Sequence, residues 1–288
     1  MADAPGALGA VVLLTFSHQI TDGRGALRAA HDLLTLIGGR LPPARPLPVA
    51  QETSLERMPS TVEPEGSPTA VASSPRGAAT LRPFDASPPN VEVAQLDYAT
   101  TERLRVNARA HAATVQGALC AAAAQALSKL TGAESIRINA PIDLRSALSL
   151  EDGVVNRFTS TTVVLQSPAD DSLWTLAQDA TAQLRVARAA ARETALMLAS
   201  LDPVDPVGAV EAEAAMLTAT DADLEITNLG ISNAGTPSAV AIWGPIMTTQ
   251  VRDERILGAI THGGRLRLVL TTHRDSEALA ATIADLLA

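Results

Sequence analysis

The sequence predicts an α/β fold, and three observations support that prediction. Segments with strand patterns alternate with segments of helical period along the chain. Near the C-terminus, two β-rich runs flank the pair Gly263-Gly264, which is a strong hairpin signal. With 288 residues, 47% of them apolar, and no internal repeat, the chain is long enough to bury a large core.

The N-terminal part predicts one strand and one helix. Residues 9–16 (GAVVLLTF) form a short apolar run with β-branched members, which is typical of a strand buried on both faces. A polar turn follows at residues 17–23. The next segment has a helical apolar face and ends at Gly38-Gly39. That face carries Leu27, Ala30, Leu34 and Ile37.

Residues 40–90 differ in composition from the rest of the chain, because they hold eleven of its 18 prolines. Little periodicity is present, so we interpret them as a crossover or linker between two lobes. The predicted divisions are therefore 1–39, a remnant of a first lobe; 40–90, the linker; and 91–288, a second lobe.

Regular patterns return at Val91. Strands are predicted at residues 91–98, 135–144, 158–166, 224–228, 239–243, 255–262 and 265–272. Helices are predicted from Thr100 or Thr101 to about Ala112, from Thr114 to about Leu130 with Gly132 closing it, from Ser172 to about Ser200, near 208–219, and from Ser276 to the C-terminus.

Composition and charge exclude several classes of protein. A net charge of −9 is unfavourable for general nucleic-acid binding, which needs clustered Lys and Arg. The single cysteine, Cys120, excludes a disulfide framework and a cysteine-based zinc site, and its alanine-rich surroundings predict a buried small side chain. No apolar run has the length of a membrane span, and the opening segment lacks the basic region of a signal peptide. We therefore expect a cytoplasmic protein.

One histidine stands out among five scattered ones. His18 follows the predicted strand on a turn, where a histidine can project into a cleft and act as a general base. Asp22 would hold the loop through an arginine from elsewhere, and Gly23 would allow the chain to turn into the helix. The pattern H-x-x-x-D-G is weak alone, and taken by itself it favours a loop histidine with an aspartate helix cap.

The order of motifs resembles the CoA-dependent acyltransferase superfamily. That group includes the condensation domains of nonribosomal peptide synthetases and polyketide-associated acyltransferases such as phthiocerol/phthiodiolone dimycocerosyl transferases. The resemblance covers nearly the whole chain. It is carried by S-H-Q-I-T-D-G at 17–23, the segment 96–127, A-P-I-D-L-R at 140–145, V-N-R-F at 155–158 and I-T-N-L-G at 226–230.

The resemblance implies a two-lobed, chloramphenicol-acetyltransferase-like fold whose first lobe is largely missing here. It implies acyl transfer from an acyl-CoA or acyl carrier protein thioester to a small-molecule alcohol or amine, with His18 as base and no metal or organic cofactor. Asp22 carries over as a structural residue paired with an arginine. Arg145 is the candidate partner, although Arg24 and Arg28 are nearer in sequence, and Arg145 could also pair locally with Asp143.

Several other residues have two possible roles. Ser17, Asn228 and Asn233 are candidates for lining the substrate tunnel, while the asparagines are equally well explained as turn residues. Arg185, Arg188 and Arg192 share one helix face that could meet a CoA phosphate or an acidic carrier protein, but a solvated face is favoured.

Two departures from the family pattern favour an alternative. Ser17 replaces the first histidine of H-H-x-x-x-D-G, and only one strand precedes the motif. The D-F-G-W-G motif of the plant branch is also absent. The alternative is a catalytically inactive condensation-like module that binds a carrier protein or partner subunit. Association with a missing N-terminal lobe predicts exposed apolar surface near residues 9–37.

Overall fold

Six strands form one mixed sheet in the computed structural model, which describes residues 9–56, 79–146, 153–199, 220–232, 239–275 and 277–288 and six positions between 210 and 218. The strand order is β1-β6-β5-β4-β2-β3, and β2, β4 and β5 run parallel. The strands are β1 (Asn90–Gln95), β2 (Ser135–Asp143), β3 (Phe158–Gln166), β4 (Leu224–Ser232), β5 (Arg255–His262) and β6 (Arg265–Thr272). The predicted α/β class is confirmed.

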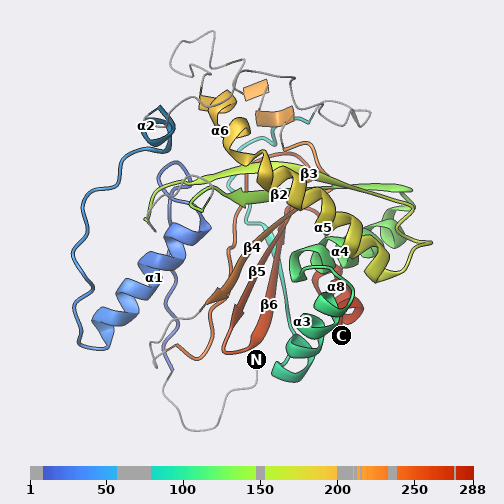
Figure 1. Cartoon of the computed structure of the whole chain (residues 1–288), viewed down its shortest axis with the longest axis horizontal. Coiled ribbons are helices and arrows are strands. Elements are labelled where there is room, and N and C mark those ends of the chain that lie inside the picture. The colour runs from blue at the N-terminus through green and yellow to red at the C-terminus, as the bar shows by residue number, and fades with distance from the viewer. Residues whose placement is uncertain are drawn as a thin grey trace.

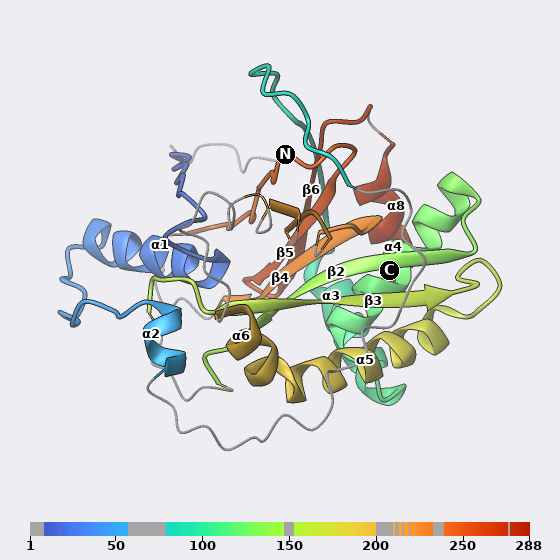
Figure 2. The same ribbon diagram turned by 90° about the horizontal axis from the view of Figure 1, so that it is seen from above.

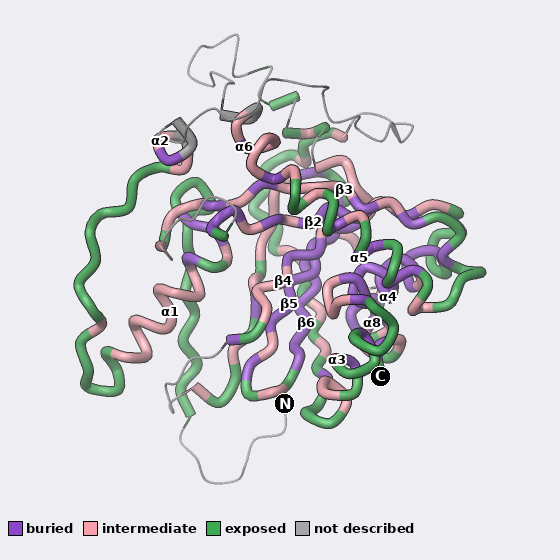
Figure 3. The backbone as a smooth tube through the Cα atoms, in the orientation of Figure 1, coloured by how far each residue is buried: buried purple, intermediate pink, exposed green. Residues whose placement is uncertain are grey.

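Four helices cover one face of this sheet (Figure 1, Figure 2). They are α3 (Tyr98–Ala110), α4 (Val115–Thr131), α5 (Leu173–Ala189) and α8 (Leu279–Leu287). The alanine-rich α4 is buried along most of its length, over residues 117–124 and 126–128, since small side chains allow it to pack closely against α5, α8 and the strands. This face therefore carries the main hydrophobic core (Figure 3).

The opposite face of the sheet faces α1 (Gly23–Ile37) and the segment 239–254 (Figure 1). That segment crosses β5 so closely that a Cβ on Gly258 would lie 2.0 Å from the carbonyl oxygen of Pro245. Two shorter helices, α2 (Gln51–Glu56) and α6 (Ala191–Ala199), contact each other beyond the edge strand β3. We call the side of the sheet with α1 the open face.

The strand predicted at residues 9–16 is wrong. This segment joins no sheet ladder, and every residue from 9 to 20 is exposed (Figure 3). An apolar run becomes a buried strand only where other elements cover both its faces, and nothing in the described part of the chain does so here. The expected exposed apolar surface near 9–37 is confirmed. Its large members are Val11, Val12, Leu13, Leu14, Phe16, Ile20, Leu36 and Ile37.

Three other elements differ from prediction. Residues 239–243 form no strand, because they pair with no strand of the sheet. The helix from Ser172 ends at Ala189, and α6 then covers a small separate cluster around Ile142 and Leu144. Asp97, not Thr100 or Thr101, caps α3, because its carboxylate accepts a hydrogen bond from the Thr100 amide.

Several local signals are confirmed. Thr114 and Ser172 cap α4 and α5, and Gly132 ends α4 in the left-handed conformation. Gly263 and Gly264 both have positive φ and join β5 to β6, as the hairpin signal predicted. Ser276 and Asn233 lie outside the described residues, and so does much of the helix predicted near 208–219.

Candidate active site

Asp22 anchors the loop that carries His18. Its side chain is 8% exposed, and its two carboxylate oxygens accept four hydrogen bonds. Two come from the amides of Gly25 at 2.8 Å and Arg157 at 2.8 Å, and two from the Arg145 guanidinium at 3.0 and 3.1 Å. One carboxylate thus caps α1 and ties the helix to the end of β2.

Arg145 is the partner that the sequence suggested for Asp22. Its guanidinium also donates to the Asp143 carboxylate at 2.9 Å and to the carbonyls of Gly153 and Val155. Burial acts to lower the pKa of Arg145, but hydrogen bonds and charges from Asp22 and Asp143 outweigh it and raise that pKa. Both pairings weighed from the sequence are therefore present together.

The two arginines nearer in sequence bind other acids. Arg24 lies 3.4 Å from Asp143, and Arg28 lies 3.6 Å from Asp32. Both begin on α1 and remain partly exposed, whereas Arg145 is 5% exposed. Burial, and not nearness in sequence, selects the partner of the buried carboxylate.

The segment V-N-R-F at residues 155–158 contacts the turn that carries His18 and holds its backbone. The Asn156 amide donates to the His18 carbonyl at 2.8 Å, and the Phe158 ring centroid lies 5.4 Å from that of His18. The backbone of Arg157 donates to Asp22, and the Val155 carbonyl accepts from Arg145. The backbone of His18 is thereby positioned, while the residue itself is exposed.

Two glycines allow α1 to begin this close to its neighbours. A Cβ on Gly23 would lie 2.6 Å from Leu229 Cδ2, the end of a flexible side chain. A Cβ on Gly25 would lie 2.4 Å from the Val154 carbonyl oxygen, which is backbone and less able to move. Gly23 was singled out from the sequence, but Gly25 is the more constrained position.

The candidate tunnel residues have different environments. Asn228 Oδ1 accepts a hydrogen bond from the Gly230 amide at 2.9 Å, beside an irregularity in the β4–β5 ladder. This is the turn-type bonding that the alternative reading described. Ser17 is exposed, and its Oγ accepts only a long bond from the Gln19 amide.

Glu225 is an acidic residue of the open face that sequence reasoning missed. Its β4 neighbours Leu224 and Ile226 point into the core, so its side chain points the other way. Burial and, more weakly, Glu254 raise the pKa of Glu225, while a hydrogen bond from Asn139 at 3.0 Å and the charge of His18 act to lower it. His18 therefore lies within electrostatic range of this face.

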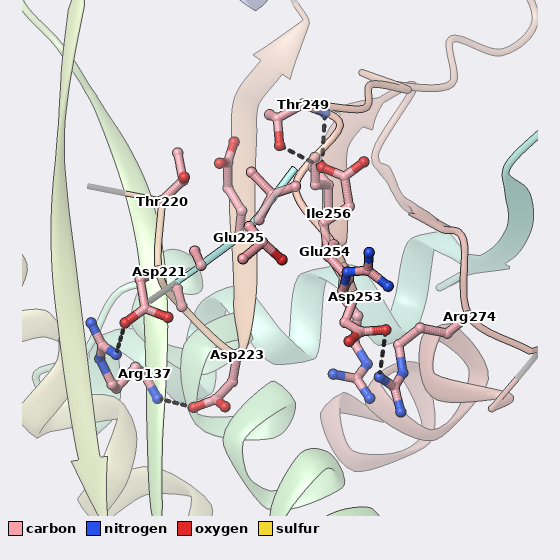
Figure 4. A pocket seen from close by; sticks show the side chains of 16 residues that line it. Arg137, Thr220, Asp221, Asp223, Glu225, Thr249, Asp253, Glu254, Ile256 and Arg274 are labelled. Carbon is pink, nitrogen blue, oxygen red and sulfur yellow. Dashed lines mark hydrogen bonds and ion pairs between the residues drawn. The ribbon is translucent and has the colours of Figure 1, made fainter. Parts of the chain in front are cut away.

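A cavity of about 370 Å³ lies at the ends where β4 and β5 begin (Figure 4). Glu225 is at its wall, but His18 is not among its lining residues. Much of the wall is occupied by polar pairs: Arg137 with Asp221 at 2.7 Å, and Thr249 with Glu254. These wall groups therefore bind one another, and the His18 loop lies elsewhere on the molecule.

The comparisons with known proteins agree with the motif order. Residues 85–244, more than half of the chain, match the family described as phthiocerol/phthiodiolone dimycocerosyl transferase C-terminus. The chain belongs to this family. No curated protein matches the sequence.

Solved structures resembling this dimycocerosyl transferase-family chain share its fold at low sequence identity. Polyketide synthase associated protein 5 from Mycobacterium tuberculosis is 16% identical, with a TM-score of 0.61 over 94% of this chain and 71% of that one. An epimerization domain of tyrocidine synthetase B is 13% identical, with a TM-score of 0.57 over 94% and 65%. A condensation domain of the enacyloxin polyketide synthase is 16% identical, with a TM-score of 0.52 over 94% and 55%.

These likenesses establish the acyltransferase and condensation fold. The chain spans between about half and about seven tenths of the length of these three structures. None of the described helices is long and apolar enough to cross a membrane. Within the same described ranges, no three His, Cys, Asp or Glu side chains gather as metal ligands.

Proposed function

We propose that this chain transfers an acyl group from a CoA or carrier-protein thioester to an alcohol or amine, with His18 as general base. The observation that carries the proposal is the anchoring of the His18 loop by Asp22, Arg145 and Asn156. A catalytic base needs a fixed backbone and an imidazole that substrate can reach, and His18 has both. The reaction needs no metal or organic cofactor.

An imidazole nitrogen of His18 takes the proton of the acceptor O–H or N–H, and the acceptor heteroatom bonds to the thioester carbonyl carbon. The carbon–sulfur bond then breaks, and the thiolate leaves with the proton that His18 received. Asp22 is a positioning residue here, because both of its oxygens are occupied by loop, helix and arginine donors.

The test compares His18→Ala with a matched control, His111→Ala. His111 is also exposed, but it stacks on Trp174 on the helix-covered side. We expect consumption of acyl thioesters with candidate acceptors to be lost in the first variant and kept in the second. Both variants should unfold at nearly the wild-type denaturant concentration, because neither removes a buried side chain. Unchanged turnover in His18→Ala would remove the mechanism.

A second candidate function is favoured by the exposed apolar residues of the segment 9–37. Side chains such as Leu13, at 81% exposed, and Ile37, at 60%, indicate a surface that a partner covers. In this alternative the chain is a non-catalytic module that binds a carrier protein or partner subunit. Hydrophobic dye binding and self-association in sedimentation experiments are the expected results. A monomer that binds no hydrophobic dye would count against this second function.

A further inference from the structure

A serine hydroxyl lies between two histidines that come from different elements. Ser232 is the last residue of β4 and His262 is the last residue of β5, and the two are partners in the parallel ladder. His262 Nδ1 lies 3.3 Å from Ser232 Oγ, and Nε2 of His31, on α1, lies 3.1 Å from the same oxygen. We call these three residues the serine–histidine cluster.

The serine–histidine cluster joins α1 to the open face of the sheet. Leu257 and Ala259 of β5 point into the core, so His262 points to the open face, where α1 lies (Figure 1). Both strand residues of the cluster are 7% exposed. Asp22 anchors the beginning of α1, and His31 makes its contact about two and a half turns further along. The cluster therefore holds the second half of the helix.

A backbone carbonyl fixes the direction of the hydrogen bonds in the cluster. The Ala239 carbonyl can only accept, and it lies 3.1 Å from His262 Nε2, so that nitrogen carries a proton. In neutral His262, Nδ1 is then an acceptor and takes the hydrogen of the Ser232 hydroxyl. The Ser232 oxygen in turn accepts from Nε2 of His31. All three hydrogen bonds are satisfied when both imidazoles are neutral.

Protonation of both imidazoles is incompatible with this set of hydrogen bonds. A protonated imidazole donates from both nitrogens, so His31 and His262 would both donate to Ser232 Oγ. The hydroxyl hydrogen of Ser232 would then lose its acceptor in the cluster. Two positive charges would also face one hydroxyl group in a partly buried place, where their repulsion is stronger than in water.

The charged groups around the cluster are mostly basic. Arg28 lies one turn before His31 on α1, and Nη1 of Arg267, on β6, donates to the backbone carbonyl at the end of β5 at 2.9 Å. Asp32 is the nearby acid on α1, but its carboxylate already pairs with Arg45 at 2.8 Å and with Arg28 at 3.6 Å. An added proton therefore has little free negative charge to pair with.

The surroundings of His31 act together against its protonation. Burial first, and then the charges of His262 and Arg28, lower the pKa of His31, against an opposite effect of Asp32. Released α1 would lose both the burial and the contact with His262. His31 therefore binds a proton more weakly in docked α1 than in released α1.

We propose that the serine–histidine cluster is an acid-sensitive contact that holds the second half of α1 on the sheet at neutral pH and releases it in mild acid. Docking is strongest above the ordinary pKa of histidine, about 6.5, and weakens as the pH falls below that value. Because α1 begins directly after the turn that carries His18, release of the helix changes the space over the open face. The contact requires no particular role for His18, so it stands apart from the proposed reaction.

The experiment measures hydrogen exchange of the α1 amides at residues 31–37 at about pH 7.5 and about pH 5.0, corrected for the intrinsic effect of pH on exchange. It compares the wild type with His31→Gln, in which the side-chain amide can still donate to Ser232 but does not titrate. The matched control is His111→Gln, because His111 is an exposed histidine on the helix-covered side. Amides of the buried helix α4 serve as the internal reference.

We expect the protection of the wild-type α1 amides to fall in acid relative to those of α4. The part of this fall that His31→Gln removes should lie between about threefold and about thirtyfold, the upper figure being the limit for one histidine over this pH range. His111→Gln should behave as the wild type does. An equal fall in His31→Gln and wild type, or an equal fall in α1 and α4, overturns the proposal.

A second variant covers the case in which His31→Gln changes the packing of α1. Ser232→Ala removes only the hydroxyl group between the two histidines. The α1 amides should then lose about threefold to tenfold of their protection already at about pH 7.5, because His31 loses its partner on the sheet. Protection as high as in the wild type would show that the cluster does not hold the helix. Neither measurement depends on turnover, so a failure here is distinct from a failure of the His18 mechanism.

Discussion

Replacing Asp22 with asparagine tests whether one buried carboxylate holds the His18 loop. The substitution keeps the shape but converts one accepting oxygen into an NH₂ donor. In either orientation that group faces one backbone amide, of Gly25 or Arg157, and one amino group of Arg145. Two of the four hydrogen bonds are therefore lost, together with the ion pair.

The expected loss of unfolding free energy follows from those two bonds. Hydrogen bonds to charged groups contribute about 1.5–3 kcal/mol each, which gives a range of about 3–6 kcal/mol. Arg145 keeps Asp143 and two carbonyls as partners, so the lower end applies. We expect Asp22→Asn to lose about 3 kcal/mol, near the usual cost of breaking a buried pair from one side.

The assay is urea denaturation followed by circular dichroism, with Arg24→Gln as the matched control. Arg24 is 50% exposed and lies 3.4 Å from Asp143, so its loss should cost less than about 1 kcal/mol. Hydrogen exchange at the amides of Gly25 and Arg157 should quicken in Asp22→Asn alone. A loss below about 1 kcal/mol in Asp22→Asn would refute the anchoring argument.

Three further predictions test other parts of the structure. Gly25→Ala should lower the unfolding free energy by about 1–3 kcal/mol, whereas Gly38→Ala, whose Cβ would have ordinary room, should change it by less than 1 kcal/mol or so in the same urea assay. Because burial raises the pKa of Glu225, the folded protein keeps the Glu225 carboxyl protonated to higher pH than the unfolded chain does. The unfolding free energy of the wild type therefore falls as pH rises from the pKa of Glu225 in the unfolded chain to its higher pKa in the folded protein. Glu225→Gln should remove that decline and be the more stable protein at neutral pH; a less stable variant in pH-dependent denaturation would contradict this. Burial raises the pKa of Cys120 to about 12, so thiol reagents should label it only after unfolding, and rapid labelling of the native chain would show that it is not buried.

Local signals made much of the fold predictable. Thr114, Ser172 and Gly132 act on the residues next to them, so their effect can be deduced from the sequence alone. The strand predicted at residues 9–16 is absent. Their apolar run describes what could be buried, but burial needs covering elements that the run itself does not specify. The end of α5 at Ala189 likewise follows from α6 covering Ile142 and Leu144, a tertiary contact.

In the candidate site, too, the residues that belong to a motif were predictable, and those that act through tertiary contacts were not. His18 and Asp22 were found because one spaced motif contains both, and Arg145 was named as the partner from the family resemblance. The ion pair between Asp22 and Arg145 is present although 123 residues separate them. Asn156 was quoted as part of a motif but given no role, because a side chain that binds a distant carbonyl leaves no periodic or compositional signal.

The positions of these residues imply that anchoring and enclosure of His18 are separate properties of the fold. The anchor is complete within the described chain: Asp22 has all its acceptor bonds, and Asn156 holds the His18 carbonyl. The enclosure of His18 is incomplete, because His18 and the apolar residues just before it are exposed. The proposed base is fixed but exposed to water, and it lacks the shielding that strengthens electrostatic stabilisation of a developing oxyanion. A cover over residues 9–20 should therefore raise the turnover rate without changing the unfolding free energy contributed by Asp22 and Arg145.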